Sequence, residues 1–407
     1  ESLMQNVSGL ISGNQVNIAT GEDMIQKDSG KISGDEINID STGSVNQNQD
    51  GIITADNIDI KSANNIVQND DGEISAVNKL SLDVDKDIIQ NDTSLIEAST
   101  IDINQNSDTG DNVTQGENSQ IIAGHLNIDT VNSQILTGDN EIDKFNSTNS
   151  GTNNIELDNS NELTITGITQ STGDIDINND ANLEITDTVS TEADGNINLT
   201  STGDQTISGD ISAGGTGNII LEANDPDTTD DLLEGKITVN DNINGITSVS
   251  GNIRLSAGKN ITLDSLVETA GNINITSVRD IQANALLEAL DGDSATVNTI
   301  TLNAGRNLIQ NGTSKIKSDL IDIDTGKDLT QNDSGNISAE EVIVDTGRHF
   351  IQNESSKIAS AEIIINTGKN LTQNDSGIIS GNQLEINTGE SLMQNVSGLI
   401  SGNQVNI

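Results

Sequence analysis

Short stretches of alternating apolar and polar residues recur along the whole chain and are separated by residues that favour turns. A recurrent form is an apolar–polar–apolar triplet, as at residues 16–18, 37–39 and 58–60. Successive side chains of an extended strand point to opposite faces, so each triplet predicts a short β-strand with one buried face. No helical period of 3.6 residues runs through these stretches, and the chain is therefore predicted to be all-β.

A glutamine marks each repeat near the two ends of the sequence. The spacing is 21 residues in each of the two series, except for one step of 22 between Gln68 and Gln90. The ten marked copies are Gln5, Gln26, Gln47, Gln68, Gln90, Gln310, Gln331, Gln352, Gln373 and Gln394. A repeat of this length without a helical pattern is typical of a solenoid built from strands.

An isoleucine stands six positions after every one of these glutamines. The set is Ile11, Ile32, Ile53, Ile74, Ile96, Ile316, Ile337, Ile358, Ile379 and Ile400. The residue before it varies freely, as Leu10, Lys31 and Glu73 illustrate, which is expected of an outward-facing neighbour on a strand. The isoleucines are therefore predicted to stack in the core.

Each repeat contains three short strands, separated by turns at an Asn-x-Ser-Gly sequence, at a small residue and at Thr-Gly. Three strands per coil of about 21 residues predict a parallel β-helix, or β-solenoid, with coils about 4.8 Å apart. Tryptophan and tyrosine are absent, which agrees with a narrow interior in which aliphatic side chains stack on their equivalents.

Alternation places the recurrent glutamine on the inward side, where an unpaired amide would be unfavourable. Amides stacked about 4.8 Å apart can bond to one another along the axis. The asparagine that follows most of these glutamines can form a second row at the turn. We interpret both rows as structural ladders, with a polar surface row that binds a ligand as the alternative.

Residues 1–18 and 390–407 are identical, although neighbouring repeats agree only in part. This identity predicts tandem units of about 389 residues, each holding roughly 18 or 19 coils and about 90 Å long. The chain is then a window on a longer protein. Residues 1–103 and 305–407 are predicted to form regular coils, with 390–407 starting the next unit.

Residues 104–304 lose the glutamine register but keep the triplets, which predicts less regular coils with loop insertions. Residues 224–231 and 280–291 are the expected excursions from the solenoid. The second segment is expected to form a short helical turn.

The net charge and the composition argue against several classes of binding partner. The 64 acidic and 17 basic residues give a net charge of −47, which argues against binding to nucleic acid or to an anionic membrane surface. No cysteine is present, and no apolar run approaches the roughly 20 residues of a membrane span. Cation-rich surroundings are the expected setting.

Candidate chemistry is sparse. The carboxylates lack the aromatic platforms of β-helical polysaccharide enzymes, and the two histidines, His125 and His349, are interpreted as surface residues. We predict no catalytic, cofactor or metal site. Four acids, Asp225, Asp227, Asp230 and Asp231, could converge on calcium, but diffuse binding of calcium or other cations along the acidic surface is favoured.

Two segments, GNIRLSAGKNITL at residues 251–263 and TITLNAGRNLIQ at residues 299–310, resemble repeats of filamentous haemagglutinin-like exoproteins of two-partner secretion. The resemblance implies a right-handed β-helix, export through an outer-membrane partner and a role at the cell surface.

The sequence therefore favours a non-enzymatic extracellular structural protein, a tandem unit of a long β-solenoid filament or surface fibre. The alternative is a cell-surface adhesin stalk that attaches a cell to other cells or surfaces. Neighbouring copies of the same repeat are the expected partners, and other cell surfaces or carbohydrate are further candidates.

Overall fold

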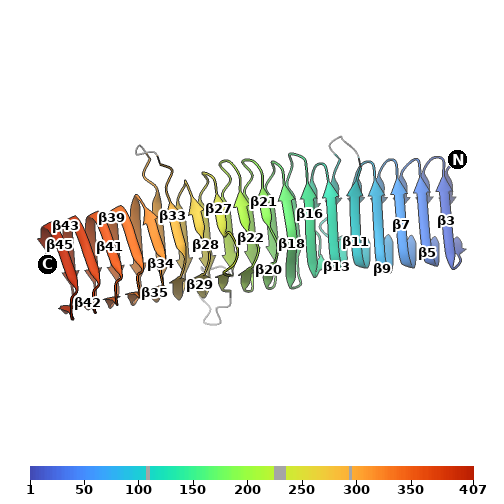
Figure 1. The fold of residues 1–407 in the computed structure, drawn as a ribbon. Coiled ribbons are helices and arrows are strands. Elements are labelled where there is room, and N and C mark those ends of the chain that lie inside the picture. Colours follow the sequence, from blue (N-terminus) through green and yellow to red (C-terminus); the bar gives the residue numbers. More distant parts are fainter. Residues whose placement is uncertain (107–110, 224–234, 293–295) are drawn as a thin grey trace. The chain divides into compact units, whose positions relative to one another are not determined.

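The computed structural model describes residues 1–106, 111–223, 235–292 and 296–407. The chain divides into two compact units, Glu1–Leu199 and Thr200–Ile407. The described residues contain 45 strands and no helix, and the all-β parallel solenoid predicted from the sequence is confirmed, with about 18 coils in all. Figure 1 shows the strands of successive coils lying side by side within each unit. Across the described residues, no helix is long and apolar enough to cross a membrane.

The strands of the first unit and of the boundary are as follows. The first unit contains β1 (Leu3–Gln5), β2 (Leu10–Ser12), β3 (Gln15–Thr20), β4 (Met24–Gln26), β5 (Lys31–Ser41), β6 (Val45–Gln47), β7 (Ile52–Ser62), β8 (Ile66–Gln68), β9 (Glu73–Val84), β10 (Ile88–Gln90), β11 (Leu95–Gln105), β12 (Val113–Gln115), β13 (Gln120–Thr130), β14 (Gln134–Leu136), β15 (Glu141–Ile142), β16 (Lys144–Asn149), β17 (Ile155–Asn159), β18 (Leu163–Gln170), β19 (Ile175–Asn179), β20 (Leu183–Ile185) and β21 (Val189–Thr191). The boundary between the units falls within β22 (Ile197–Ser201).

The strands of the second unit continue the same numbering. They are β23 (Gln205–Ile207), β24 (Ile211–Ala213), β25 (Ile219–Ala223), β26 (Ile237–Val239), β27 (Ile246–Ser248), β28 (Ile253–Ala257), β29 (Asn260–Leu263), β30 (Val267–Thr269), β31 (Ile273–Ser277), β32 (Asp280–Ala283), β33 (Leu286–Ala289), β34 (Thr299–Ala304), β35 (Asn307–Gln310), β36 (Lys315–Ser318), β37 (Leu320–Thr325), β38 (Leu329–Gln331), β39 (Asn336–Thr346), β40 (Phe350–Gln352), β41 (Lys357–Thr367), β42 (Asn370–Gln373), β43 (Ile378–Thr388), β44 (Ser391–Gln394) and β45 (Leu399–Asn406).

Within each unit, the described coils add their strands in parallel to the equivalent strands of the preceding coil. In the first unit β4 pairs with β6, with Gln26 opposite Gln47, and in the second β38 pairs with β40, with Gln331 opposite Gln352. In many regular coils the second and third predicted strands run together as one long strand. The 11-residue β5 is an example, and its alternation of buried and exposed residues breaks next to Gly34, where the chain turns a corner.

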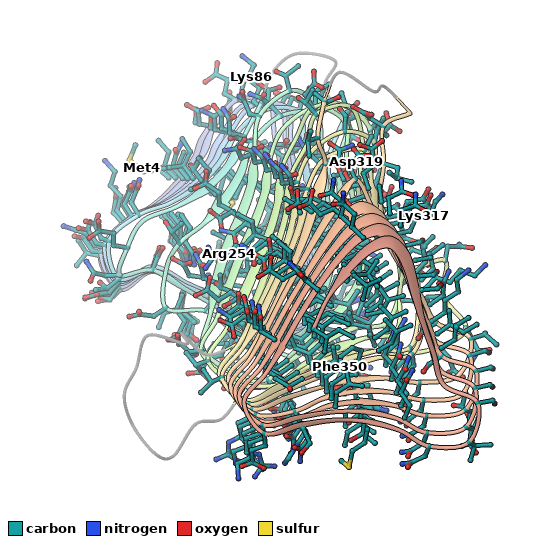
Figure 2. All side chains as sticks on the ribbon, turned by 90° about the vertical axis from the view of Figure 1, so that its left-hand side faces the viewer. Met4, Lys86, Arg254, Lys317, Asp319 and Phe350 are labelled. Carbon is teal, nitrogen blue, oxygen red and sulfur yellow. The ribbon has the colours of Figure 1, made fainter. Side chains whose placement is uncertain are left out.

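The core consists of the inward side chains of these strands. Ile32 and Ile53 are fully buried and stack on each other, and burial of one isoleucine contributes roughly 1.5 to 3 kcal/mol. The chain's two phenylalanines, Phe145 and Phe350, are also fully buried. Figure 2 shows Phe350 inside the coils and Lys317 pointing away from them. The interior is therefore wide enough for an occasional ring among the aliphatic side chains.

One sequence expectation is wrong. Residues 280–291 do not form a helical turn, because Asp280–Ala283 and Leu286–Ala289 are the strands β32 and β33. Both alternate half-buried and buried residues, and both pair in register with the next coil. The side chains of Ile281 and Leu287 fill the core, which is the reason the segment stays in the solenoid. The other expected excursion, residues 224–231, lies outside the described residues, as do the four acids considered for calcium.

Candidate functional site: side-chain ladders and outward rows

The recurrent glutamines of the first unit form a hydrogen-bonded ladder inside the coils. Gln26, Gln47 and Gln68 are 1 to 2% exposed, and each donates from Nε2 to Oε1 of the glutamine one coil earlier, over 3.2, 3.1 and 2.9 Å. The same Nε2 also donates to the carbonyl oxygen four residues later, as from Gln26 to Gly30 over 2.8 Å. These amides therefore satisfy one another and the adjacent turn.

The second unit contains an equivalent ladder. Gln331, Gln352, Gln373 and Gln394 each donate to the preceding glutamine over 2.8 to 2.9 Å. All the donors run in one direction along the chain, so the ladder has a donor end and an acceptor end. The amides of Gln310, Gln331, Gln352 and Gln373 are fully buried, and they line no outer surface.

The ladder of the first unit has one break, at the step of 22 residues. Gln90 lies opposite Gln68 in the strand register, but its Nε2 donates only to the carbonyl oxygens of Ser94 and Gln120. The buried Oε1 of Gln68 consequently has no hydrogen-bond partner among the described residues. The structure offers no physical reason for this break.

The sequence reasoning missed one member of this ladder, Gln115. It lies opposite Gln90, donates to its Oε1 over 3.3 Å, and exchanges a further pair of hydrogen bonds with Asn140. Gln115 follows Gln90 by 25 residues, so a search for a period of 21 residues does not find it. The signal that would have found it is Ile121, which follows Gln115 by the same six positions as in the other copies.

The predicted isoleucines stack within each unit. In the first unit the internal copies Ile32, Ile53, Ile74 and Ile96 pair in register and are at most 2% exposed. In the second unit Ile316, Ile337, Ile358 and Ile379 do the same and are fully buried. Ile11 and Ile400 are half-buried because each belongs to a coil with a neighbour on one side only.

The asparagines after the glutamines form a second ladder at the turn. In the second unit Asn332, Asn353, Asn374 and Asn395 each donate from Nδ2 to the preceding Oδ1 over 2.8 to 2.9 Å. In the first unit Asn48, Asn69 and Asn91 are linked in the same way over 2.7 and 2.8 Å. The internal members are half-buried, so this ladder lies at the edge of the core.

The next residue of each turn adopts a left-handed backbone conformation, which the sequence reasoning did not foresee. Asp70, Asp333 and Asp375 have φ of 55 to 56°, a region that Asp and Asn enter more readily than most residues. The turn therefore stacks acidic side chains on its outer face. In the second unit the charge of Asp333 raises the pKa of Glu354, with a smaller effect from Asp375.

Stacked acids recur on the outer faces of the strands. The pKa of Asp176 is raised by partial burial and by the charges of Glu156 and Asp158, and that of Asp322 by partial burial and by Asp345. These carboxylates repel one another, which makes the outer face sensitive to pH and to cations.

Six acids among the described residues form ion pairs with lysine or arginine, and the pKa of two of them is lowered. Burial alone would raise the pKa of Asp102, but hydrogen bonds from Lys79 and Asn127 outweigh it and lower that pKa. Asp328 follows the same rule, with Arg348 as the donor that lowers its pKa. Such ion pairs are few beside the acids of the chain, so they neutralise only a small part of the surface charge.

The two histidines lie in different units, and both are half-buried. His125 lies 3.5 Å from the hydroxyl of Thr166, and the backbone N–H of His349 donates to Asp328. Among the described residues, no three His, Cys, Asp or Glu side chains come close enough to hold a metal ion.

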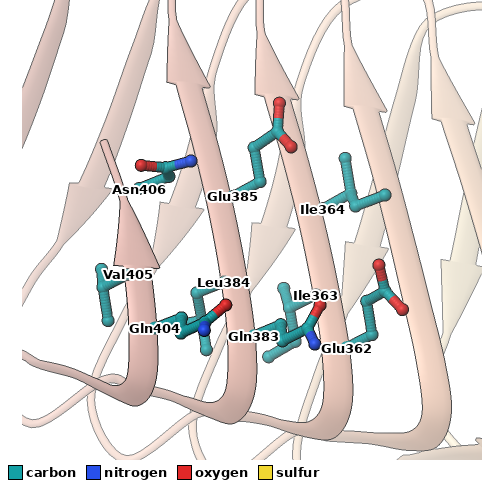
Figure 3. A pocket seen from close by; sticks show the side chains of 9 residues that line it. All are labelled: Glu362, Ile363, Ile364, Gln383, Leu384, Glu385, Gln404, Val405 and Asn406. Atoms are coloured by element: carbon teal, nitrogen blue, oxygen red, sulfur yellow. The ribbon is translucent and has the colours of Figure 1, made fainter.

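A shallow groove crosses the last coils of the second unit. Figure 3 shows its outward row of Glu362, Gln383 and Gln404, next to Glu385 and Asn406. Amides and carboxylates of this kind can form hydrogen bonds with a polar partner. The row is a continuation of the strand register, with Glu362 opposite Gln383 and Gln383 opposite Gln404, and it contains no nucleophile with an adjacent base.

Comparison with known proteins adds no relative, since no family model, no curated protein and no solved structure matches this chain.

Proposed function

We propose that this protein is a non-enzymatic structural protein of the cell exterior, in which units of about 389 residues follow one another in a long β-solenoid filament or surface fibre. The observation that carries the proposal is the identity of residues 1–18 and 390–407, together with the position of each copy in its coil stack.

Each of the two identical segments pairs with one neighbouring coil. The neighbour covers one face of the coil in residues 1–18 and the opposite face in residues 390–407. Residues 1–18 pair with the coil that follows them, with Leu3 opposite Met24, and residues 390–407 pair with the coil before them, with Leu371 opposite Leu392. Both pairings have an offset of 21 residues. The same 18-residue sequence thus accepts a coil on either side in one register, as a segment joining two units must.

The surface charge supports a fibre that works in a cation-rich medium. Outward acids whose pKa is raised by partial burial and by neighbouring carboxylates, such as Asp176 beside Glu156 and Asp322 beside Asp345, favour loosely bound calcium or other cations between neighbouring fibres. We infer that neighbouring copies are the main partners, and that the family resemblance to haemagglutinin-like exoproteins points to the cell surface as the location.

Fibre diffraction and electron microscopy of the natural assembly test the proposal. We expect a lengthwise spacing of about 4.8 Å and an axial repeat of about 90 Å per unit. Lateral bundles should separate when a chelator removes divalent cations. A fibre without the 4.8 Å spacing would refute the filament. A distinct domain at the fibre tip that binds cells or carbohydrate would instead favour the adhesin stalk.

A further inference from the structure

One corner of the second unit collects basic side chains in a chain that is otherwise acidic. Six of the 17 lysines and arginines occupy the same turn position in successive coils. From the second of them on, the backbone N–H donates to the carbonyl oxygen of the one before, over 2.7 to 2.9 Å. We call this row the basic edge, and its members are Lys259, Arg279, Arg306, Lys327, Arg348 and Lys369.

Ion pairs within the chain neutralise only part of the basic edge. Arg348 pairs with Asp328, and Lys369 pairs with Glu390. Among the described residues, the other four members of the edge form no ion pair. Like charges that stack about one coil, or 4.8 Å, apart repel one another. Anionic groups from outside the chain would offset this repulsion.

The short strands that follow the basic edge carry no outward charge. The outward residues of β29, β32, β35, β38, β40 and β42 pair in register and are half-buried. We call them the neutral row, and they are Thr262, Gln282, Ile309, Thr330, Ile351 and Thr372. An uncharged and partly apolar strip between charged edges is suited to the centre of a contact between two proteins.

Acids stand on the other side of the neutral row in three of these coils. The acidic edge consists of Asp333, Glu354 and Asp375, which are exposed. Each follows a residue of the basic edge by six positions. A shallow groove runs along these acids beside the ladder asparagines, where long basic side chains of a partner could lie. The same coils therefore carry a positive charge at one edge of this face and a negative charge at the other.

We propose that this face binds the same face of a second copy of the chain, around a two-fold axis parallel to the solenoid axis. The rotation reverses the direction from the basic edge to the acidic edge, so the basic edge of each copy lies along the acidic edge of the other. Coils of the two copies stay parallel and at the same height. Lys327 then faces Asp333 of the second copy, and Thr330 faces its own equivalent.

Only the parallel arrangement satisfies both edges. A two-fold axis across the coils would make the copies antiparallel and would oppose each edge to itself. Both copies have the same coil spacing, so one matched pair of charges brings the others into register. Calcium or other cations reduce the repulsion between two chains of net charge −47, and the charged edges determine which faces meet. The proposal names the contact surface between neighbouring copies of the proposed fibre and rests on that function.

Cysteine cross-linking tests the contact, because the chain has no cysteine of its own. Thr262→Cys and Thr372→Cys lie at the two ends of the neutral row. Ser338→Cys, a half-buried outward position on β39, is the control on another face. With a short bifunctional maleimide, in calcium and about 0.15 M sodium chloride, each neutral-row variant should cross-link to the same residue of a second copy. Ser338→Cys should stay monomeric, and antiparallel copies would link at most one end of the row.

Charge reversal in the Thr372→Cys chain tests the two edges. Lys327→Glu opposes two carboxylates at both equivalent contacts, so cross-linking should need about five- to fiftyfold more protein. Adding Asp333→Lys to Lys327→Glu restores opposite charges and should restore cross-linking. Arg254→Glu changes the net charge as much as Lys327→Glu does, but on β28 of another face, and should have little effect.

The charge variants should fold, because other coils carry similar side chains at the same turn positions. Glu390 follows Lys369 in the row of the basic edge, and Gln49 has the left-handed conformation of Asp333. Circular dichroism checks this. Equal cross-linking of Ser338→Cys, a self-cross-link at one end of the neutral row only, or no rescue by the double reversal would overturn the inference. Chains that bind polyglutamate through the basic edge but never cross-link would overturn it too, since the partner would then be a different polyanion.

Failure of this contact is distinguishable from failure of the proposed function. A natural fibre that keeps its axial repeat, while Thr372→Cys chains stay monomeric at every concentration, would lose the lateral contact alone. Absence of the spacing of about 4.8 Å from the natural fibre would remove the filament itself.

Discussion

Replacement of one internal glutamine by leucine probes the contribution of the amide ladder. Gln331 is fully buried, donates to Gln310 over 2.8 Å and accepts from Gln352 over 2.9 Å. Gln331→Leu keeps much of the side-chain volume. It removes the donor to Oε1 of Gln310 and one acceptor of the Nε2 group of Gln352. Each such group costs about 1 to 3 kcal/mol, partly offset by the added apolar surface, so we expect a net loss of about 2 to 4 kcal/mol.

Gln68→Leu is the matched comparison, because the ladder is already broken after Gln68. This change removes the donor to Gln47 but also removes a buried oxygen that has no partner. The expected loss is about 0 to 2 kcal/mol, smaller than for Gln331→Leu.

Hydrogen exchange of backbone amides, read coil by coil, is the suitable assay because a solenoid can open locally rather than in one step. Peptides from residues 310–373 should exchange faster in Gln331→Leu, and those from residues 47–90 should change less in Gln68→Leu. Equal effects in the two variants, or greater protection in Gln331→Leu, would refute the view that paired amides stabilise the stack.

Three further predictions concern the turns and the surface. A Cβ on Gly347 would overlap the backbone carbonyl oxygen of Gly326, so Gly347→Ala should lower the free energy of unfolding of its unit by about 2 to 4 kcal/mol. Gly13→Ala should change the free energy of unfolding little, because other coils have alanine at that position. Val396 is a β-branched residue at φ 62°, so Val396→Asn should slow hydrogen exchange in the last coil by stabilising it about 1 kcal/mol; faster exchange would contradict this. The raised pKa of Asp176 means that the folded state binds a proton more tightly than the unfolded chain, so its contribution to the free energy of unfolding grows as pH falls from neutral through the folded pKa. Asp176→Asn should raise stability at pH 7 and flatten urea unfolding against pH, whereas Asp328→Asn should lower stability at pH 7, because the pKa of Asp328 is lowered and its contribution is lost in acid.

The regular coils could be predicted from the sequence because equivalent residues stack directly on one another. A position such as that of Ile32 meets its own equivalent, Ile53, so the same residue type suits every copy. The spacing of six between Gln and Ile fixes which side faces inward. That one relation locates the strands, the core and the amide ladder.

The coils in the middle of the chain were harder to predict from the sequence, because their turns vary in length while their strands stay in register. Gln115 follows Gln90 by 25 residues and still lies opposite it. Residues 280–291 were expected to form a helical turn, but in β33 Leu287 is buried and the adjacent Leu286 is only half-buried, as the two-residue period of a strand requires. The spacing of six residues between the glutamine and the isoleucine is kept in this part of the chain, as Gln115 and Ile121 show, whereas the coil length is not.

The break in the ladder and the left-handed turns depend on details that composition does not record. Gln68 and Gln90 have the same residue type and register as the bonded pairs, yet their amides do not meet. Asp70, Asp333 and Asp375 were visible as turn residues, but nothing in a single sequence shows that this one position takes a positive φ in every regular coil.

The variation in coil length explains how a long solenoid tolerates irregular sequence without losing its stack. In β9 two residues, Val77 and Asn78, lie opposite a single residue of each neighbouring strand, and the pairing resumes at Lys79 in both directions. Val77 is 68% exposed, so the additional residue projects outward and leaves the core unchanged. Register is therefore set locally, by inward side chains that fit only their own equivalents, and not by the number of residues in a coil. A solenoid stabilised in this way can be extended from either face by any coil that presents the same inward residues.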